Sequence, residues 1–140
     1  FTEGGNFSLG KMDAFAFFKT VVEETNSFAT FDTGHILSYQ WIKGNAGAKL
    51  LDGLESALPL DHCHEIHLSG SSVVSNRFVD LHHGIILDEQ LAILDFLIER
   101  CPNLRGVTYE DPKFTTDGEL VMKALPNFKK LQERVAAWAR

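Results

Sequence analysis

Segments with helical spacing alternate with short strand-like runs along this chain, and this alternation restricts its fold more than any other feature. Apolar residues recur at helical intervals over residues 12–25, 50–58 and 88–98. A further helical stretch begins at Asp117 and is interrupted at Pro126. The inner face of the last helix is marked by Phe128, Leu131, Val135 and Trp138. The strand-like runs cover residues 28–31, 63–68 and 105–110. Such alternation predicts a parallel sheet with helices packed on it, either doubly wound or a (β/α) barrel.

The size and composition favour one globular domain over residues 1–140. The chain has 140 residues, of which 44% are hydrophobic, and this is enough to bury a single core. No apolar stretch approaches the roughly 20 residues that a membrane span requires. Pro59 and Pro102 end two of the expected helices, and Asp88 is a candidate N-cap. The connection from Ser71 to Leu87 is long for a parallel fold, so we expect it to be functional.

Charge and cysteine content restrict the partners and the compartment. The net charge of −6 argues against binding to a phosphate backbone, so we expect neither nucleic acid nor a membrane as a partner. Cys63 and Cys101 are far apart in the sequence and form no CxxC pair, which excludes a zinc knuckle or a dithiol motif by spacing. We expect both thiols to be reduced, as in a cytoplasmic protein.

Histidines and carboxylates cluster where the expected strands end. All 6 histidines lie between residues 35 and 83. Four carboxylates occupy comparable places, namely Glu3, Asp32, Asp80 and Glu110. Because the carboxyl ends of parallel strands meet at one edge, these groups should converge. Two carboxylates about 4 Å apart repel by roughly 4 kcal/mol at an effective dielectric near 20, so convergence requires protonation or bound cations. Imidazoles mixed with carboxylates suit iron, zinc or manganese.

The stretch FDTGH, residues 31–35, brings Asp32 and His35 out of a short apolar strand and precedes a polar stretch at residues 36–40. It is compatible with a turn, a core histidine or a metal site. We expect Gly34 to turn the backbone sharply, so that both side chains face one centre.

Taken singly, the other candidates have structural explanations. Asp80-x-His82 fits a solvated loop, His67 fits a core histidine, and Glu110 fits a helix start. His62, His64 and Glu65 are either surface residues or supporting groups. The ordered combination at successive strand ends favours a metal site.

That ordered combination, Glu3, Asp32-x-x-His35, His67 within EIHLSG, Asp80-x-His82 and Glu110, resembles the metal scaffold of the xylose-isomerase-like (β/α)-barrel superfamily, which includes endonuclease IV. Within this superfamily, four stretches resemble the multinuclear non-heme iron-dependent oxidative enzymes, the family that includes the iron enzyme of methanobactin biosynthesis. These stretches are FFKTVVEETNSFATFDTGH, LPLDHCHEIHLSG, FVDLHHGIILDEQLAILDFLIER and VTYEDPKF. The resemblance extends from residue 1 to about residue 115.

The resemblance implies the C-terminal half of a (β/α)8 TIM barrel that binds two or three iron ions, with zinc or manganese as alternatives. It implies an iron-dependent oxidoreductase that uses dioxygen to oxidise a side chain, often cysteine, of a ribosomally made precursor peptide, which a small partner protein presents. The implied metal ligands are Glu3, Asp32, His35, His67, Asp80, His82 and Glu110. His64 and His83 would support the ligands or face the substrate. Many family members carry Asn where this chain has His35, whereas endonuclease-like relatives use His.

The resemblance also explains the Phe at position 1, because barrels of this kind run to about 250 residues and the first half would be absent. Half a barrel would leave open sheet edges, so we expect the isolated chain to be inactive and to associate with another chain. Other functions stay open at this point. A divalent-metal sugar isomerase or a zinc phosphodiesterase uses a similar scaffold, and a non-catalytic scaffold protein would keep the fold alone.

Overall fold

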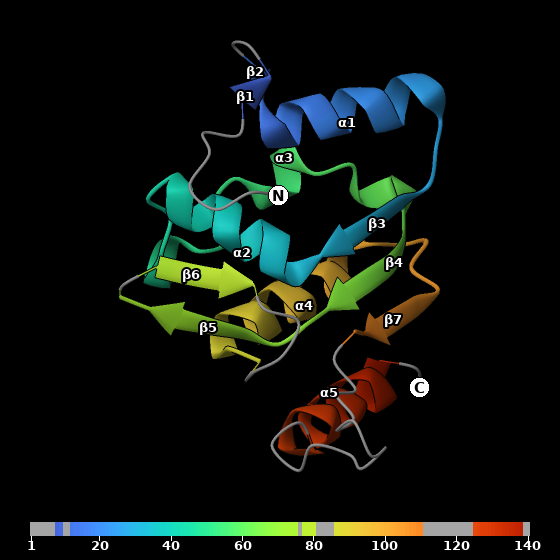
Figure 1. The fold of residues 1–140 in the computed structure, drawn as a ribbon. Coiled ribbons are helices and arrows are strands. Elements are labelled where there is room, and N and C mark those ends of the chain that lie inside the picture. Colours follow the sequence, from blue (N-terminus) through green and yellow to red (C-terminus); the bar gives the residue numbers. More distant parts are fainter. Residues whose placement is uncertain (1–7, 10–11, 76, 81–85, 111–124, 139–140) are drawn as a thin grey trace, which may run out of the picture.

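The computed structural model describes residues 8–9, 12–75, 77–80, 86–110 and 125–138 (Figure 1). The helices are α1 (Ala14–Thr25), α2 (Thr33–Ile42), α3 (Leu54–Ala57), α4 (Asp88–Arg100) and α5 (Leu125–Trp138), with 3-10 turns at Gly47–Lys49 and Leu60–His62. The strands are β1 (Ser8–Leu9), β2 (Met12–Asp13), β3 (Ala29–Asp32), β4 (Cys63–Leu68), β5 (Ser71–Val74), β6 (Arg77–Asp80) and β7 (Gly106–Tyr109).

Three of these strands form a parallel sheet in the order β3-β4-β7, which is also their order along the chain. Two antiparallel pairs, β1 with β2 and β5 with β6, lie outside this sheet. The predicted α/β class with parallel strands is therefore confirmed. The parallel sheet of the described residues is small and open (Figure 1).

A β-bulge in β4 decides which side chains share a face of the sheet. Ala29 pairs with Cys63 and Thr30 pairs with Glu65, so His64 is the extra residue. Beyond the bulge, alternation sends Ile66 and Leu68 to one face and Glu65 and His67 to the other. The first face is buried under helices, and the second face is polar.

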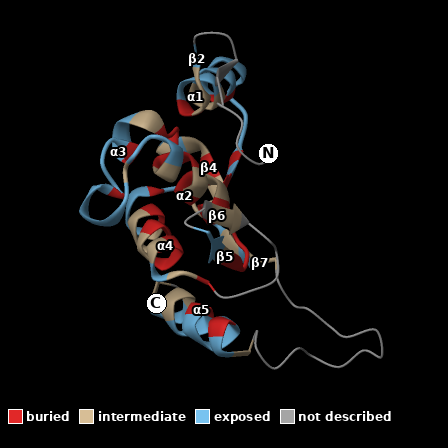
Figure 2. Ribbon diagram, turned by 60° about the vertical axis from the view of Figure 1, so that its left-hand side comes forward, coloured by how far each residue is buried: buried red, intermediate tan, exposed pale blue. Residues whose placement is uncertain are grey.

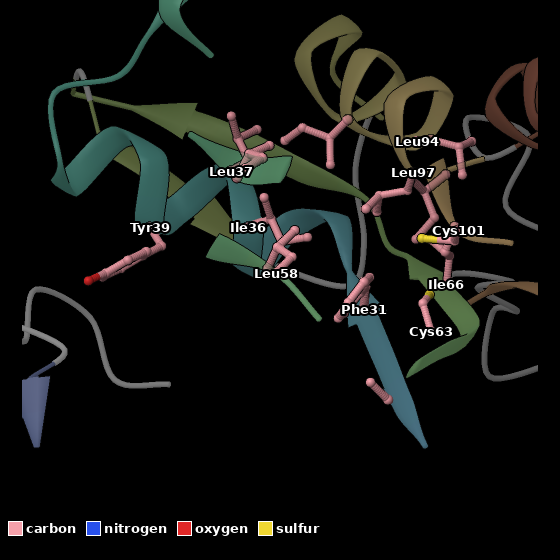
Figure 3. Packing of buried hydrophobic residues seen from close by; sticks show 14 of the residues in the cluster. Phe31, Ile36, Leu37, Tyr39, Leu58, Cys63, Ile66, Leu94, Leu97 and Cys101 are labelled. Carbon is pink, nitrogen blue, oxygen red and sulfur yellow. The ribbon is translucent and has the colours of Figure 1, made fainter. Parts of the chain in front are cut away.

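The apolar face is covered by α2 and α4. Phe31 from β3 and Ile66 from β4 are buried among Leu37 of α2 and Leu94 and Leu97 of α4 (Figure 3). Figure 2 shows that buried residues gather where these two helices meet the strands. Burial of each such aliphatic side chain contributes about 1.5–3 kcal/mol. Residues at the polar face stay accessible, since Thr30 and Thr108 are exposed.

Helix α2 follows β3 without a loop, and the sequence analysis did not predict it. Asp32 is its N-cap, and the Asp32 Oδ1 accepts hydrogen bonds from the amides of Gly34 (2.7 Å) and His35 (3.0 Å). The sharp turn expected at Gly34 is wrong, because Gly34 lies in the first helical turn and the change of direction comes from the cap. Ile36 and Leu37 are buried, so the stretch read as polar is part of the core.

The helix expected over residues 50–58 is reduced to α3. Gly53 has φ 75°, and this left-handed conformation separates Leu50 from the helical turn that begins at Leu54. The buried Gln40 side chain holds the preceding loop, because its Nε2 donates to the carbonyl oxygens of Leu50 (2.6 Å) and Asp52 (3.2 Å). Leu50 and Leu54 are nevertheless both buried, as the apolar spacing predicted.

One further expectation on local structure is corrected. The N-cap of α4 is Leu87, one residue before Asp88, and Gln90 caps the helix by accepting from the Leu87 amide at 3.1 Å. The connection expected after Ser71 contains the β5–β6 hairpin.

The last helix differs from its prediction at one position. Phe128 is 47% exposed, although Leu131 is buried as expected. Arg134 pairs with Asp95 of α4 and ties the two helices together. The helix start expected at Asp117 lies outside the described residues.

The two cysteines meet in space although they are far apart in sequence. Cys63 begins β4 and Cys101 follows α4, and both are buried free thiols whose sulfurs lie close together (Figure 3). A hydrogen bond with Cys101 and burial raise the pKa of the Cys63 thiol, while the same hydrogen bond lowers the pKa of Cys101.

Among the described helices, none is long and apolar enough to cross a membrane.

Candidate metal centre

Three of the predicted metal ligands meet at the carboxyl end of the parallel sheet. Asp32, His67 and Glu110 each offer one ligand atom, and these atoms all lie within 4.8 Å of one another. Each residue comes from a different chain segment, at the end of β3, within β4 and directly after β7. All three side chains are partly buried.

The strand register produces this convergence. Asp32 is directly opposite His67, and His67 is directly opposite Thr108. Glu110 lies two residues beyond Thr108, and its amide donates to the Leu68 carbonyl oxygen (2.9 Å), which extends the ladder by one step. Alternation then puts Glu110 on the same face as His67. Parallel pairing, and not a local turn, brings the three ligands together.

The Asp32 carboxylate has a second role in addition to its place in this group. Its Oδ1 caps α2, where the partial positive charge of the helix N-terminus stabilises a carboxylate. The cap fixes the side chain at the point where β3 becomes α2. A candidate ligand is thus oriented by the same contacts that start the helix.

His67 lies between two carboxylates. Its Nδ1 is 2.8 Å from Oε1 of Glu110, and its Nε2 is 3.4 Å from Oε1 of Glu65. The Thr108 hydroxyl donates to that same Glu65 oxygen. This hydrogen bond is the main cause that lowers the pKa of Glu65; burial acts in the opposite direction, and the nearby His67 ring lowers the pKa further.

The electrostatics of the group favour a cation. Two carboxylates whose oxygens lie within 4.8 Å repel by roughly 3 kcal/mol or more at an effective dielectric near 20. The α2 amides stabilise Asp32 and the imidazole stabilises Glu110, so each charge is compensated separately. One divalent ion would compensate both at once, and one imidazole with two carboxylates is a donor set that suits iron, zinc or manganese.

The remaining predicted residues are placed as follows. Glu3, His82 and His83 lie outside the described residues. The backbone of Asp80 pairs with Ser71, three residues after the end of β4, so its register position is near the same end of the sheet.

Two other predicted residues are not brought into the group. His35 lies in the first turn of α2 and is not among the three ligands whose atoms converge. His64, at the bulge near the start of β4, stacks on Phe28 with ring centroids 3.9 Å apart. His64 is near the start of β4, whereas Glu110 lies beside Leu68 at the end of β4.

Two residues that contact the group were not assigned to it from the sequence. Glu65 was one of several candidate surface or supporting residues, and Thr108 was not considered. The spacing of Glu65 and His67 contained a signal, because residues i and i+2 of a strand share a face. The sequence contained no such signal for Thr108, because its contact with Glu65 depends on the register between β4 and β7.

Comparison of the sequence with models of known protein families and with curated proteins gives no match. The resemblance described above therefore stays a prediction.

Proposed function

We propose that Asp32, His67 and Glu110 hold a divalent metal ion and that the protein is a non-heme iron-dependent oxidative enzyme. The observation that carries the proposal is the convergence of these three residues, each from a different strand end, within 4.8 Å. All three belong to the seven metal ligands that the sequence resemblance implies. The iron and the oxidative reaction rest on the family resemblance.

The chain's own residues would hold and orient the ion. Asp32 is fixed by the α2 cap, and His67 is fixed between Glu65 and Glu110. Iron bound there would supply the capacity to activate dioxygen. The ligands lie at the carboxyl end of the sheet, and this is the end from which a precursor peptide, together with a presenting protein, would approach the ion.

We further propose that the sheet is part of a (β/α) TIM barrel whose other strands come from outside the described residues. The strands β3, β4 and β7 follow one another in chain order, and a polar face opposes the face covered by α2 and α4, as in one sector of a barrel. In the described sheet, β3 and β7 are edge strands, and such edges favour pairing with another chain. Light scattering should show association, and a well-behaved monomer would count against this proposal.

The two neighbouring free thiols support a cytoplasmic location. Cys63 and Cys101 are close enough to share a hydrogen bond, and such a pair stays reduced most readily in a reducing compartment.

Metal loading tests the function. The chain, with its metal removed, is incubated without oxygen in separate samples with Fe²⁺, Zn²⁺ or Mn²⁺, because zinc would displace iron in a direct competition; each sample is desalted, analysed for metal and then exposed to air. Retained iron with ferric absorption in the visible range supports the proposal. Wild-type protein that retains no metal, or an Asp32→Asn variant that retains as much as wild type, would refute the site.

A second function is favoured by the composition of the group. Two carboxylates and a single imidazole form an oxygen-rich set, which also suits manganese or zinc in a Lewis-acid isomerase or phosphodiesterase. Selective retention of zinc or manganese, with no colour in air, would favour this alternative.

A further inference from the structure

We propose that Glu65 is a positioning residue that selects Nδ1 of His67 as the metal-binding nitrogen, with Thr108 holding the Glu65 carboxylate in place. This inference rests on the proposed metal site, and it adds two residues that the ligand set does not include.

The geometry of the imidazole presents a choice. A neutral imidazole carries one N–H and one lone pair, and only the nitrogen with the lone pair can bind a cation. In His67, Nδ1 faces Glu110 and Nε2 faces Glu65. The two carboxylates therefore compete for the single imidazole proton.

The outcome of that competition determines whether the site can accept an ion. If the proton lies on Nδ1, it is donated to Glu110 and occupies the space between two candidate ligands. If it lies on Nε2, it points toward the Glu65 oxygen 3.4 Å away, and the Nδ1 lone pair is left toward Glu110 at 2.8 Å. Only the second tautomer is ready to bind a cation. A carboxylate that accepts the other N–H of a metal-binding histidine is a common arrangement in metalloproteins.

Thr108 makes Glu65 suited to this role. Its hydroxyl donates to the Glu65 oxygen that faces Nε2, and it is directly opposite His67 in the register of β4 with β7. The Glu65 side chain is 44% exposed, so without this contact it would be free to turn into solvent.

Zinc titration of the ¹⁵N-histidine-labelled chain, followed by two-bond ¹H–¹⁵N NMR, tests the inference. Zinc is used because its complexes are diamagnetic, and the His67 signals are assigned by their loss in His67→Ala. Wild type should bind zinc through Nδ1 with a proton on Nε2. Glu65→Ala should bind zinc about 10–100-fold more weakly in competition with a chromophoric chelator. Thr108→Val should weaken binding in the same direction by a smaller factor.

Glu99→Ala is the matched control, because within the described residues the ion pair of its exposed carboxylate is with the neighbouring Arg100. It should bind zinc as wild type does. Wild-type affinity and unchanged Nδ1 coordination in both Glu65→Ala and Thr108→Val would overturn the role of Glu65 and leave the metal site standing. Wild-type zinc binding through Nε2 would also overturn it. A wild-type chain that binds no zinc at His67 would instead refute the proposed site itself.

Discussion

The double role of Asp32 gives a prediction that separates folding from metal binding. Its carboxylate caps α2 through two amides and also belongs to the candidate metal group. Asn is as good an N-cap as Asp and carries no charge to repel Glu110, so Asp32→Asn should leave the free energy of unfolding of the metal-free chain unchanged or raise it. Asp32→Ala removes the cap as well as the charge, so its free energy of unfolding should be about 1 kcal/mol lower than that of Asp32→Asn.

Bound metal should raise the free energy of unfolding of wild type more than that of the Asp32 variants. An ion present at 100 times its dissociation constant raises the free energy of unfolding by about 2.7 kcal/mol. With a urea dependence of about 1–3 kcal/mol per molar, the unfolding midpoint of wild type should rise by about 1–3 M. Asp32→Asn should lose most of this metal-dependent increase, although its metal-free midpoint should be no lower than that of wild type.

The assay is urea unfolding followed by circular dichroism, with and without saturating Zn²⁺. Asp13 supplies a matched control, because it caps α1 by accepting from the amides of Phe15 (2.9 Å) and Ala16 (3.2 Å) and is not in the converging group. Asp13→Ala should lower stability while keeping the full metal-dependent increase. If Asp32→Asn kept that increase as well, the reasoning that places Asp32 at a metal would be refuted.

Three further predictions concern the scaffold. Gly53→Ala should lower the free energy of unfolding by about 1–2 kcal/mol, because its φ of 75° disfavours a Cβ even though no atom lies within 4 Å of the added carbon. Gly106→Ala has equal space and no positive φ, so it should not lower the free energy of unfolding by this amount. Chemical denaturation of both variants checks this, and equal effects would contradict it. Burial raises the pKa of Asp13, but the hydrogen bonds that the Asp13 carboxylate accepts lower this pKa by more. The stability that Asp13 contributes is therefore present above about pH 4, and it is lost as the pH falls through the lowered pKa of the folded state. Melting temperatures between pH 2 and 6 should therefore fall less steeply for Asp13→Asn than for wild type, and parallel curves would disprove the assignment. Cys63 and Cys101 are buried, so alkylation of either thiol should require unfolding. Mass spectrometry after a timed reaction with and without urea measures the modification, and rapid alkylation of the native chain would contradict this prediction.

The sequence predicted the parts of the fold that depend on apolar periodicity. The helix α1 and the strands β3, β4 and β7 lie within two residues of their expected positions. Periodicity failed for α2, because this helix is buried on several sides and its buried Gln40 reads as polar. It also failed at Gly53, since a left-handed backbone interrupts a helix without changing the apolar spacing around it.

The candidate site was predictable as far as residue type and strand position go. Asp32, His67 and Glu110 were each identified at strand ends, and convergence follows from the general geometry of parallel strands. The contact of Glu65 with His67 follows from their spacing of two in one strand, although it was not assigned to the site. The contact of Thr108 depends on the register of β4 with β7, which composition and spacing do not give.

Crystals of the chain grown with Mn²⁺ and measured at the manganese absorption edge would test the central claim most directly. The predicted result is an anomalous peak at coordination distance from a carboxylate oxygen of Asp32, Nδ1 of His67 and a carboxylate oxygen of Glu110. These three groups lying apart from one another, or a saturated crystal with no peak between them, would contradict it.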